Sequence, residues 1–212
     1  MKNTLPYWNH NTAYYPLIRK RVFDCSGTAS AALLDVGCGD GTLCRFLAGE
    51  GLTVIGVDPF PPCIAAANAK NSLPGICYLC TDFENYEPGR DRTFDAVIFS
   101  ASLHHTDMRA SLRKSRRLLG KNGSLIVLGL ASPSSFRDRL FEALRVIPSR
   151  LLTLLHRAKT CEEMNIPVSD ALPPMNDVRA AAREILPGAK IRFLLHYRYL
   201  LEWKKEEEKE EK

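Results

Sequence analysis

The feature that most limits the fold of this 212-residue chain is a glycine-rich turn. Residues Leu33 to Ala48 read LLDVGCGDGTLCRFLA, with glycines at positions 37, 39 and 41 between an apolar run and a helical pattern. A turn with so few side chains lets a ligand approach the main chain closely. In parallel α/β sheets, ligands bind beyond the carboxyl ends of the strands, where such turns lie.

The sequence around this turn alternates apolar runs with helical patterns from residue 31 to residue 130. Near-continuous apolar strands between helices are typical of a parallel sheet that is covered on both faces. The pattern therefore predicts a doubly wound, mostly parallel α/β sheet. We expect strands at 32–36, 53–57, 76–79, 94–100 and 124–130, and helices at 42–50, 62–70 and 107–119.

Further elements flank this core. Helical patterns cover residues 12–25, 136–159 and 177–186, and Pro148 is expected to break or kink the second of them. From Ile191 to Trp203, apolar and aromatic residues occupy every second position without a break in phase. A two-residue hairpin turn would shift that phase by one. We therefore expect one long, antiparallel C-terminal strand.

The expected organisation is a single domain over residues 1–203 and a charged tail over 204–212. Within the domain, residues 30–131 form the ligand-binding core, residues 12–25 an N-terminal lid helix, and residues 132–175 a substrate cover. The tail, with its run of lysine and glutamate, resembles a solvated extension of low complexity.

Composition excludes several classes of protein. No apolar run approaches the roughly 20 residues of a membrane span, and the N-terminus lacks a signal-peptide pattern, so we expect a cytoplasmic protein. The net charge of +5 permits an anionic partner without requiring nucleic acid. Seven cysteines suit a reducing compartment. We interpret the Cys77–Cys80 pair as buried structural thiols, and no histidine has the spacing of a metal ligand.

The spacing of the turn separates two classes of ligand. A dinucleotide-binding turn reads GxGxxG, and its third glycine packs the helix against the strand. Here Thr42 stands at that position. The sequence Asp35-Val-Gly37-Cys-Gly39-Asp-Gly41 instead resembles motif I of the class I S-adenosylmethionine-dependent methyltransferases. Further segments at family-like spacing are VIGVDP, Asp82-Phe83, FSASLHH and LLGKNGSLIVLGL.

The resemblance implies a Rossmann-like methyltransferase fold and S-adenosylmethionine as cofactor, with S-adenosylhomocysteine as product. It implies that Asp58 binds both ribose hydroxyls and that Asp82 accepts a hydrogen bond from the adenine amino group. The ring or the backbone of Phe83 would hold the other edge of the purine. Asp35 would orient the turn or meet the ammonium group. The implied cofactor-binding residues are Tyr14, Asp35, Gly37, Cys38, Gly39, Asp58, Pro59, Asp82, Phe83 and Ser100.

Methyl transfer needs a base only when the acceptor must lose a proton. His104 and His105 follow the fourth predicted strand, and an imidazole can take a phenol or alcohol proton near neutral pH. We predict that one of them orients or deprotonates the acceptor. The plainer alternative is that one histidine caps the next helix and the other packs. His10, Asn11, Tyr14 and Tyr15 are candidates for a lid over the cofactor.

The expected activity is methyl transfer to an oxygen, carbon or nitrogen atom of a small molecule. One alternative is a module that binds the cofactor without catalysis, and another is an RNA methyltransferase. Methylation of base amino groups is disfavoured, because Ser100 to His105 lacks the expected Asn/Asp-Pro-Pro-aromatic motif. A dehydrogenase is disfavoured by the missing third glycine. The basic, amphipathic run 136–159 could bind an anionic or lipid-like substrate or contact a membrane surface. The plainer alternative is an ordinary helix with a solvated face.

Overall fold

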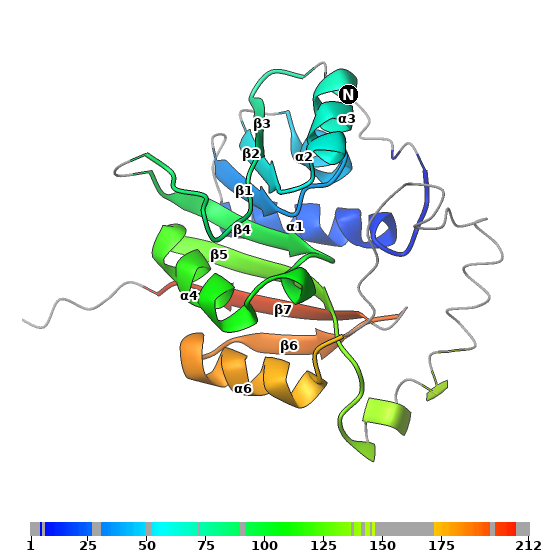
Figure 1. Cartoon of the computed structure of the whole chain (residues 1–212). Helices are drawn as coiled ribbons and strands as arrows, with labels where there is room; N and C mark the ends of the chain where they lie inside the picture. Colours follow the sequence, from blue (N-terminus) through cyan, green and yellow to red (C-terminus); the bar gives the residue numbers. More distant parts are fainter. Residues whose placement is uncertain are drawn as a thin grey trace, which may run out of the picture.

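One twisted sheet organises the molecule (Figure 1). The computed structural model describes residues 5, 7–26, 31–49, 52–71, 73–89, 92–136, 138–140, 143–144, 146, 172–195 and 198–206. Within these residues, seven strands pair in the order β3-β2-β1-β4-β5-β7-β6. They are β1 (Ala32–Val36), β2 (Thr53–Asp58), β3 (Ile76–Cys80), β4 (Phe94–Ser100), β5 (Leu119–Leu130), β6 (Lys190–Phe193) and β7 (Arg198–Lys204).

The first five strands are mutually parallel, whereas β7 runs antiparallel to both β5 and β6. The predicted doubly wound, mostly parallel sheet is therefore confirmed. Because β1 and β4 are neighbours, the chain reverses its winding direction between them. In such sheets, ligands bind at the carboxyl ends of the two strands between which the winding reverses.

Helices cover both faces of the sheet (Figure 1). The helices labelled in Figure 1 are α1 (Tyr15–Ser26), α2 (Thr42–Leu47), α3 (Pro61–Lys70), α4 (Met108–Leu118) and α6 (Met175–Ile185). The described residues also form the 3₁₀ turns η1 (Thr12–Tyr14) and η2 (Leu103–His105). Two prolines start α3, where their missing N–H groups cost no helical bond. Asp107 caps α4 by accepting a hydrogen bond from the Ala110 amide at 3.0 Å.

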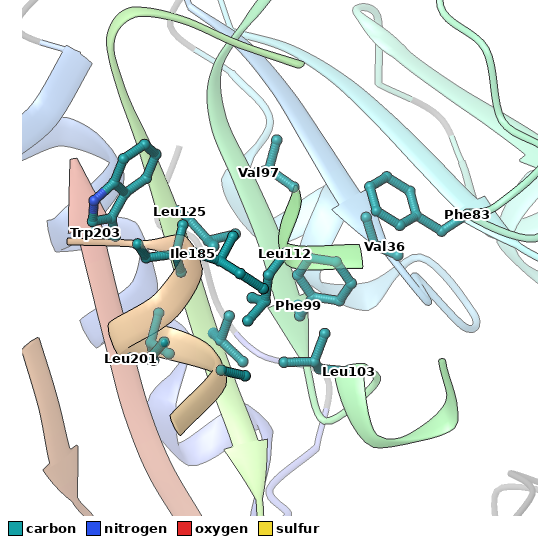
Figure 2. Close-up of a cluster of buried hydrophobic side chains, with 14 of the residues drawn as sticks. Val36, Phe83, Val97, Phe99, Leu103, Leu112, Leu125, Ile185, Leu201 and Trp203 are labelled. Carbon is teal, nitrogen blue, oxygen red and sulfur yellow. The ribbon is translucent and has the colours of Figure 1, made fainter. Parts of the chain in front are cut away.

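Two hydrophobic cores lie on opposite faces of the sheet. Ile18 of α1 and Leu43 of α2 belong to the first core, whereas Leu112 of α4 and Ile185 of α6 belong to the second. Figure 2 shows how the second core fills the space between the sheet and its two helices. None of the helices in the described part of the chain is long and apolar enough to cross a bilayer.

The predicted single C-terminal strand is wrong, although its antiparallel direction is confirmed. The chain turns back after β6, so that Phe193 pairs with Tyr199 and Ile191 pairs with Leu201. The Leu194 amide also donates to the Arg198 carbonyl at 2.8 Å. These partners differ by an even number of residues, so the hairpin keeps the alternation that a two-residue turn would have broken.

The interpretation of Cys77 and Cys80 as buried thiols is also wrong, because both are exposed. Their strand, β3, forms an edge of the sheet, and only Tyr78 among its five residues is buried. The helical region predicted over 136–159 lies mostly outside the described residues. Its described part, residues 136, 138–140, 143, 144 and 146, is helical.

Candidate active site

The glycine turn between β1 and α2 adopts a conformation that suits glycine. Gly37, Gly39 and Gly41 have φ angles of 72°, 54° and 74°, which other residues rarely adopt. A Cβ atom at Gly37 would overlap the side chain of Ser102, and one at Gly41 would overlap the ring of Tyr78. A Cβ atom at Gly39 would meet no atom within 4 Å. Gly39 therefore faces open space, as a turn that receives a ligand requires.

Hydrogen bonds fix the turn from both sides. Gly37 and Cys38 donate their amides to the Val57 carbonyl at 2.8 and 3.1 Å, and Gly39 donates to Asp58 Oδ2 at 2.9 Å. Asp40 Oδ1 accepts from the Thr42 hydroxyl at 2.6 Å. The turn is thus held in place without any help from a ligand.

Asp35 lies buried beneath this turn, with 1% of its surface exposed. Its Oδ2 accepts a hydrogen bond from the Cys44 thiol at 3.2 Å. Its Oδ1 has no hydrogen-bond partner among the residues that the structure describes. Burial raises the pKa of Asp35 to about 7; the Cys44 thiol opposes the shift and the charge of Asp58 adds to it. A bound cation would favour the ionised form of this carboxyl group.

A second unpartnered polar atom lies at the end of β4. Ser100 Oγ is buried and makes no hydrogen bond within the described ranges. In the pairing of β1 with β4, Asp35 lies opposite Ile98, two residues before Ser100. Because side chains alternate along a strand, Ser100 points to the same face of the sheet as Ile98. The next residue, Ala101, has a φ of 59°, a strained value for alanine that is common at functional sites.

The acidic residues after β2 and β3 already hold their own loops. Asp58 accepts from the amides of Gly39 and Phe60, both at 2.9 Å, and so joins the glycine turn to the start of α3. Asp82 accepts from the amide and the side chain of Asn85 at 2.7 and 2.8 Å. A carboxylate oxygen has two lone pairs, so each aspartate retains capacity for a ligand.

Phe83 departs from the role expected of its ring. The side chain is buried in the second core and packs edge-to-face on Phe99, with 5.4 Å between ring centroids. Figure 2 shows the two rings side by side in that core. Only the backbone of Phe83 thus remains available to a purine. Pro59, next to Asp58, is exposed.

The structure separates the two candidate histidines. The ring of His104 is partly buried, and its Nδ1 is fully buried with no hydrogen-bond partner in the described residues. His105 is exposed, with its ring centroid 4.0 Å from that of His104. Burial lowers the pKa of His104 to about 4, and the positive charges of His105 and Arg198 add to this shift. Neither histidine caps α4, because Asp107 does so.

The N-terminal segment (residues 7–14) lies across the carboxyl ends of these strands. Tyr7 donates to Thr42 Oγ1 at 3.5 Å, next to the glycine turn. Asn11 Oδ1 accepts from Arg198 Nε at 3.0 Å, and the Tyr14 hydroxyl donates to the Leu195 carbonyl at 3.1 Å. Tyr14 is thus joined to the chain between β6 and β7, and its role in a lid stays a prediction. Arg198 was not among the residues predicted from the sequence, and its charge helps to lower the pKa of both His10 and His104.

The raised pKa of Asp35 predicts a pH-dependent stability. Between about pH 4 and pH 7 the unfolded chain ionises this carboxyl while the folded chain keeps it protonated, so rising pH costs the folded state. Asp35→Asn should therefore gain stability relative to the natural chain as the pH rises through this window. The difference between their free energies of unfolding should increase by roughly 4 kcal/mol at most. Urea titrations at several pH values would measure it, and a difference that stays constant would contradict it.

These residues fit a ligand with a cationic group, a ribose and a purine. The buried Oδ1 of Asp35 and the Oγ of Ser100 lack partners, as atoms that receive an ammonium group would. Gly39 leaves space at the main chain, and Asp58 and Asp82 retain acceptor capacity. Cys38 is buried at 7% exposure, so its backbone is the part that can contact a ligand.

Comparisons with known proteins agree with this fit. A family model of the methyltransferase domain matches residues 34–127. An uncharacterized methyltransferase of Mycobacterium tuberculosis (strain ATCC 25618 / H37Rv) is 32% identical over 199 residues, which cover 93% of this chain and 96% of the relative. The ubiquinone biosynthesis O-methyltransferase of Rhodopseudomonas palustris (strain HaA2) is 41% identical over 102 residues, but these are 46% of this chain and 39% of that enzyme.

Among solved structures, the fold resembles the magnesium protoporphyrin IX methyltransferase of Synechocystis PCC 6803 with bound S-adenosylhomocysteine. The TM-score is 0.61 at 18% sequence identity, and the match covers 92% of this chain and 83% of the other. At this identity the likeness concerns the fold alone.

Proposed function

Because the chain belongs to the class I S-adenosylmethionine-dependent methyltransferases, we propose that it methylates a hydroxyl oxygen of a small molecule, with His104 as the base. The observation that carries this proposal is the buried, unpartnered Nδ1 of His104 at the carboxyl end of β4. An acceptor that donates a proton would supply the missing partner. A hydroxyl group, and a phenol above all, is such an acceptor.

The cofactor supplies a methyl group that is already activated on a sulfonium, so the chain's residues mainly align and deprotonate. In this proposal Asp35 and Ser100 receive the ammonium group, and the backbone of Gly37, Cys38 and Gly39 lies along the amino-acid part. Asp58, flanked by Pro59, accepts the ribose hydroxyls. Asp82 and the backbone of Phe83 hold the adenine. Alignment of this kind can supply about 7–11 kcal/mol of the barrier.

His104 would act in its neutral form. Its pKa of about 4 keeps the imidazole unprotonated at neutral pH, so Nδ1 can accept a hydrogen bond from the acceptor, although the same shift makes it a weaker base than an ordinary imidazole. Arg198 places a buried positive charge near this ring, which favours an oxygen nucleophile that becomes anionic. Tyr14, Asn11 and the rest of the N-terminal segment would exclude water above the site. We also propose a cytoplasmic location and no nucleic-acid partner.

A thermal melt tests the cofactor assignment. At a hundredfold excess over its dissociation constant, S-adenosylhomocysteine should add about 2.7 kcal/mol of stability, a shift of about 5–10 °C for a chain of this length. NAD should give no shift. Asp58→Asn should weaken S-adenosylhomocysteine binding by about tenfold in calorimetry, because it removes a charged acceptor. A shift with NAD alone would contradict the assignment.

Turnover with defined acceptors separates the remaining alternatives. Formation of S-adenosylhomocysteine with small phenols or catechols supports the proposal. Product with bulk RNA and none with phenols would identify an RNA methyltransferase. Tight cofactor binding without product from either would leave a binding module as the function.

A further inference from the structure

Three large apolar side chains form an exposed stripe on the helical segment that follows β5. Phe136, Leu140 and Leu144 recur at intervals of four residues, with exposed fractions of 81%, 51% and 66%. In the rest of the described chain, the large apolar residues with high exposure are Phe60 at 40% and Leu79 at 37%. The apolar stripe (Phe136, Leu140 and Leu144) is thus the most exposed hydrophobic surface in the described residues, and such surfaces mark interaction sites.

An ion pair on the opposite side of the helix keeps the stripe facing outward. Each helical residue advances by about 100°, which puts Asp138 about 180° from the midpoint of Phe136 and Leu140. Asp138 is 2% exposed, and its two oxygens accept from the terminal nitrogens of Arg179 on α6 at 2.6 and 3.1 Å. It also accepts from the amides of Ser134 and Ser135, both at 3.1 Å.

Because the ion pair between Asp138 and Arg179 fixes the orientation of the helix, the fold itself keeps the apolar stripe exposed. Turning the stripe inward would rotate Asp138 into solvent and leave the Arg179 guanidinium without its carboxylate. Breaking a buried pair of this kind is strongly unfavourable. Figure 1 shows the segment leaving the end of β5 and projecting beyond the sheet and its helices.

The charge around the stripe is positive. Arg139 is exposed beside it, and the sequence from 136 to 159 holds six basic and two acidic residues. One of those acids, Asp138, is neutralised by Arg179. An apolar stripe in a segment with an excess of basic residues is typical of helices that lie in the interface of a membrane containing anionic lipids.

We propose that the apolar stripe docks this protein onto a membrane surface that carries anionic lipids. A protein partner fits less well, because three such side chains expose roughly a few hundred Å², whereas a stable interface buries about 800 Å² on each partner. Insertion into the headgroup region needs no matching surface. The segment leaves the carboxyl end of β5, so docking brings the membrane to the edge of the sheet where the candidate active site lies.

Sedimentation of the full chain with lipid vesicles tests the proposal without any need for catalysis. The natural chain should bind vesicles of phosphatidylcholine with phosphatidylglycerol, and bind pure phosphatidylcholine much more weakly. Leu140→Gln with Leu144→Gln should lower the partition coefficient at least tenfold, because each buried methylene contributes to insertion. Arg139→Glu should lower it several-fold and reduce its salt dependence. Leu79→Gln, on the edge strand β3, should bind as the natural chain does.

Two results would overturn the proposal. One is equal binding by the natural chain and the Leu140/Leu144 variant, which would assign the binding to net charge alone. The other is failure of the natural chain to bind the anionic vesicles. In that case, a dimer that the Leu140/Leu144 variant converts to monomer in light scattering would assign the stripe to a second copy. If the natural chain is instead a monomer, another part of the same chain would be the segment that covers the apolar stripe.

Discussion

Replacement of His104 by asparagine is expected to lower kcat for a phenolic acceptor by about 10²–10⁴. The Nδ1 of His104 is buried, makes no hydrogen bond within the described residues and follows β4, where the proposal places the acceptor. Asparagine has similar size but cannot take a proton near neutral pH. His105→Asn should change kcat by a factor of a few, because that ring lies in solvent. Rates of S-adenosylhomocysteine formation at saturating cofactor measure both effects.

The pH dependence supplies an independent readout. With its pKa lowered to about 4, His104 stays neutral across pH 5.5–7.5, so kcat/KM should not decline with acid in that range on account of this group. A decline with acid inside this range would contradict the assignment of His104 as the base. Cofactor affinity should stay within about twofold in both variants, which separates a lost base from a damaged fold.

Alanine at Gly37 is expected to lower the free energy of unfolding by roughly 2–5 kcal/mol. The φ of 72° strains any residue with a Cβ atom, at a cost of about 1–2 kcal/mol. Overlap with Ser102 adds about 1–3 kcal/mol, because that serine donates to the Val36 carbonyl and cannot move without losing the bond. Urea unfolding without ligand measures the change.

Alanine at Gly39 forms the matched control. Its φ of 54° brings a similar backbone strain, but its Cβ atom would meet nothing within 4 Å. This variant should lose only about 1–2 kcal/mol of stability while its affinity for S-adenosylhomocysteine falls more than tenfold. Unchanged affinity in folded Gly39→Ala would show that the cofactor does not lie against the turn. Equal destabilisation in the two variants would contradict the role assigned to Ser102.

Local patterns were enough to predict the parallel part of the fold. Continuous apolar runs such as Ala96–Phe99 are typical of strands that are buried on both faces, and the glycines after β1 have positive φ angles. The C-terminal hairpin was missed because the alternation of apolar residues shows only whether the number of residues in a turn is odd or even. A turn with an odd number of residues and an uninterrupted strand give the same pattern.

The site was predictable only where its residues follow strands of the core. Asp35, Asp58 and Ser100 occupy such positions, and the structure brings them to one edge. Arg198 and Asn11 are 187 residues apart, and no local pattern connects them. The burial of Phe83 and Cys38, and the exposure of Cys77, depend on which helices cover each strand. Tertiary packing decides this, and a sequence period does not.

The pairing of Asn11 with Arg198 has a consequence for how the protein is made. During synthesis Asn11 leaves the ribosome well before its partner, which is added 187 residues later. The N-terminal segment therefore waits, without its final contacts, until β7 enters the sheet. A chain that stops before β7 can build the glycine turn but cannot close the site over it. Closure of the active site thus depends on the synthesis of β7.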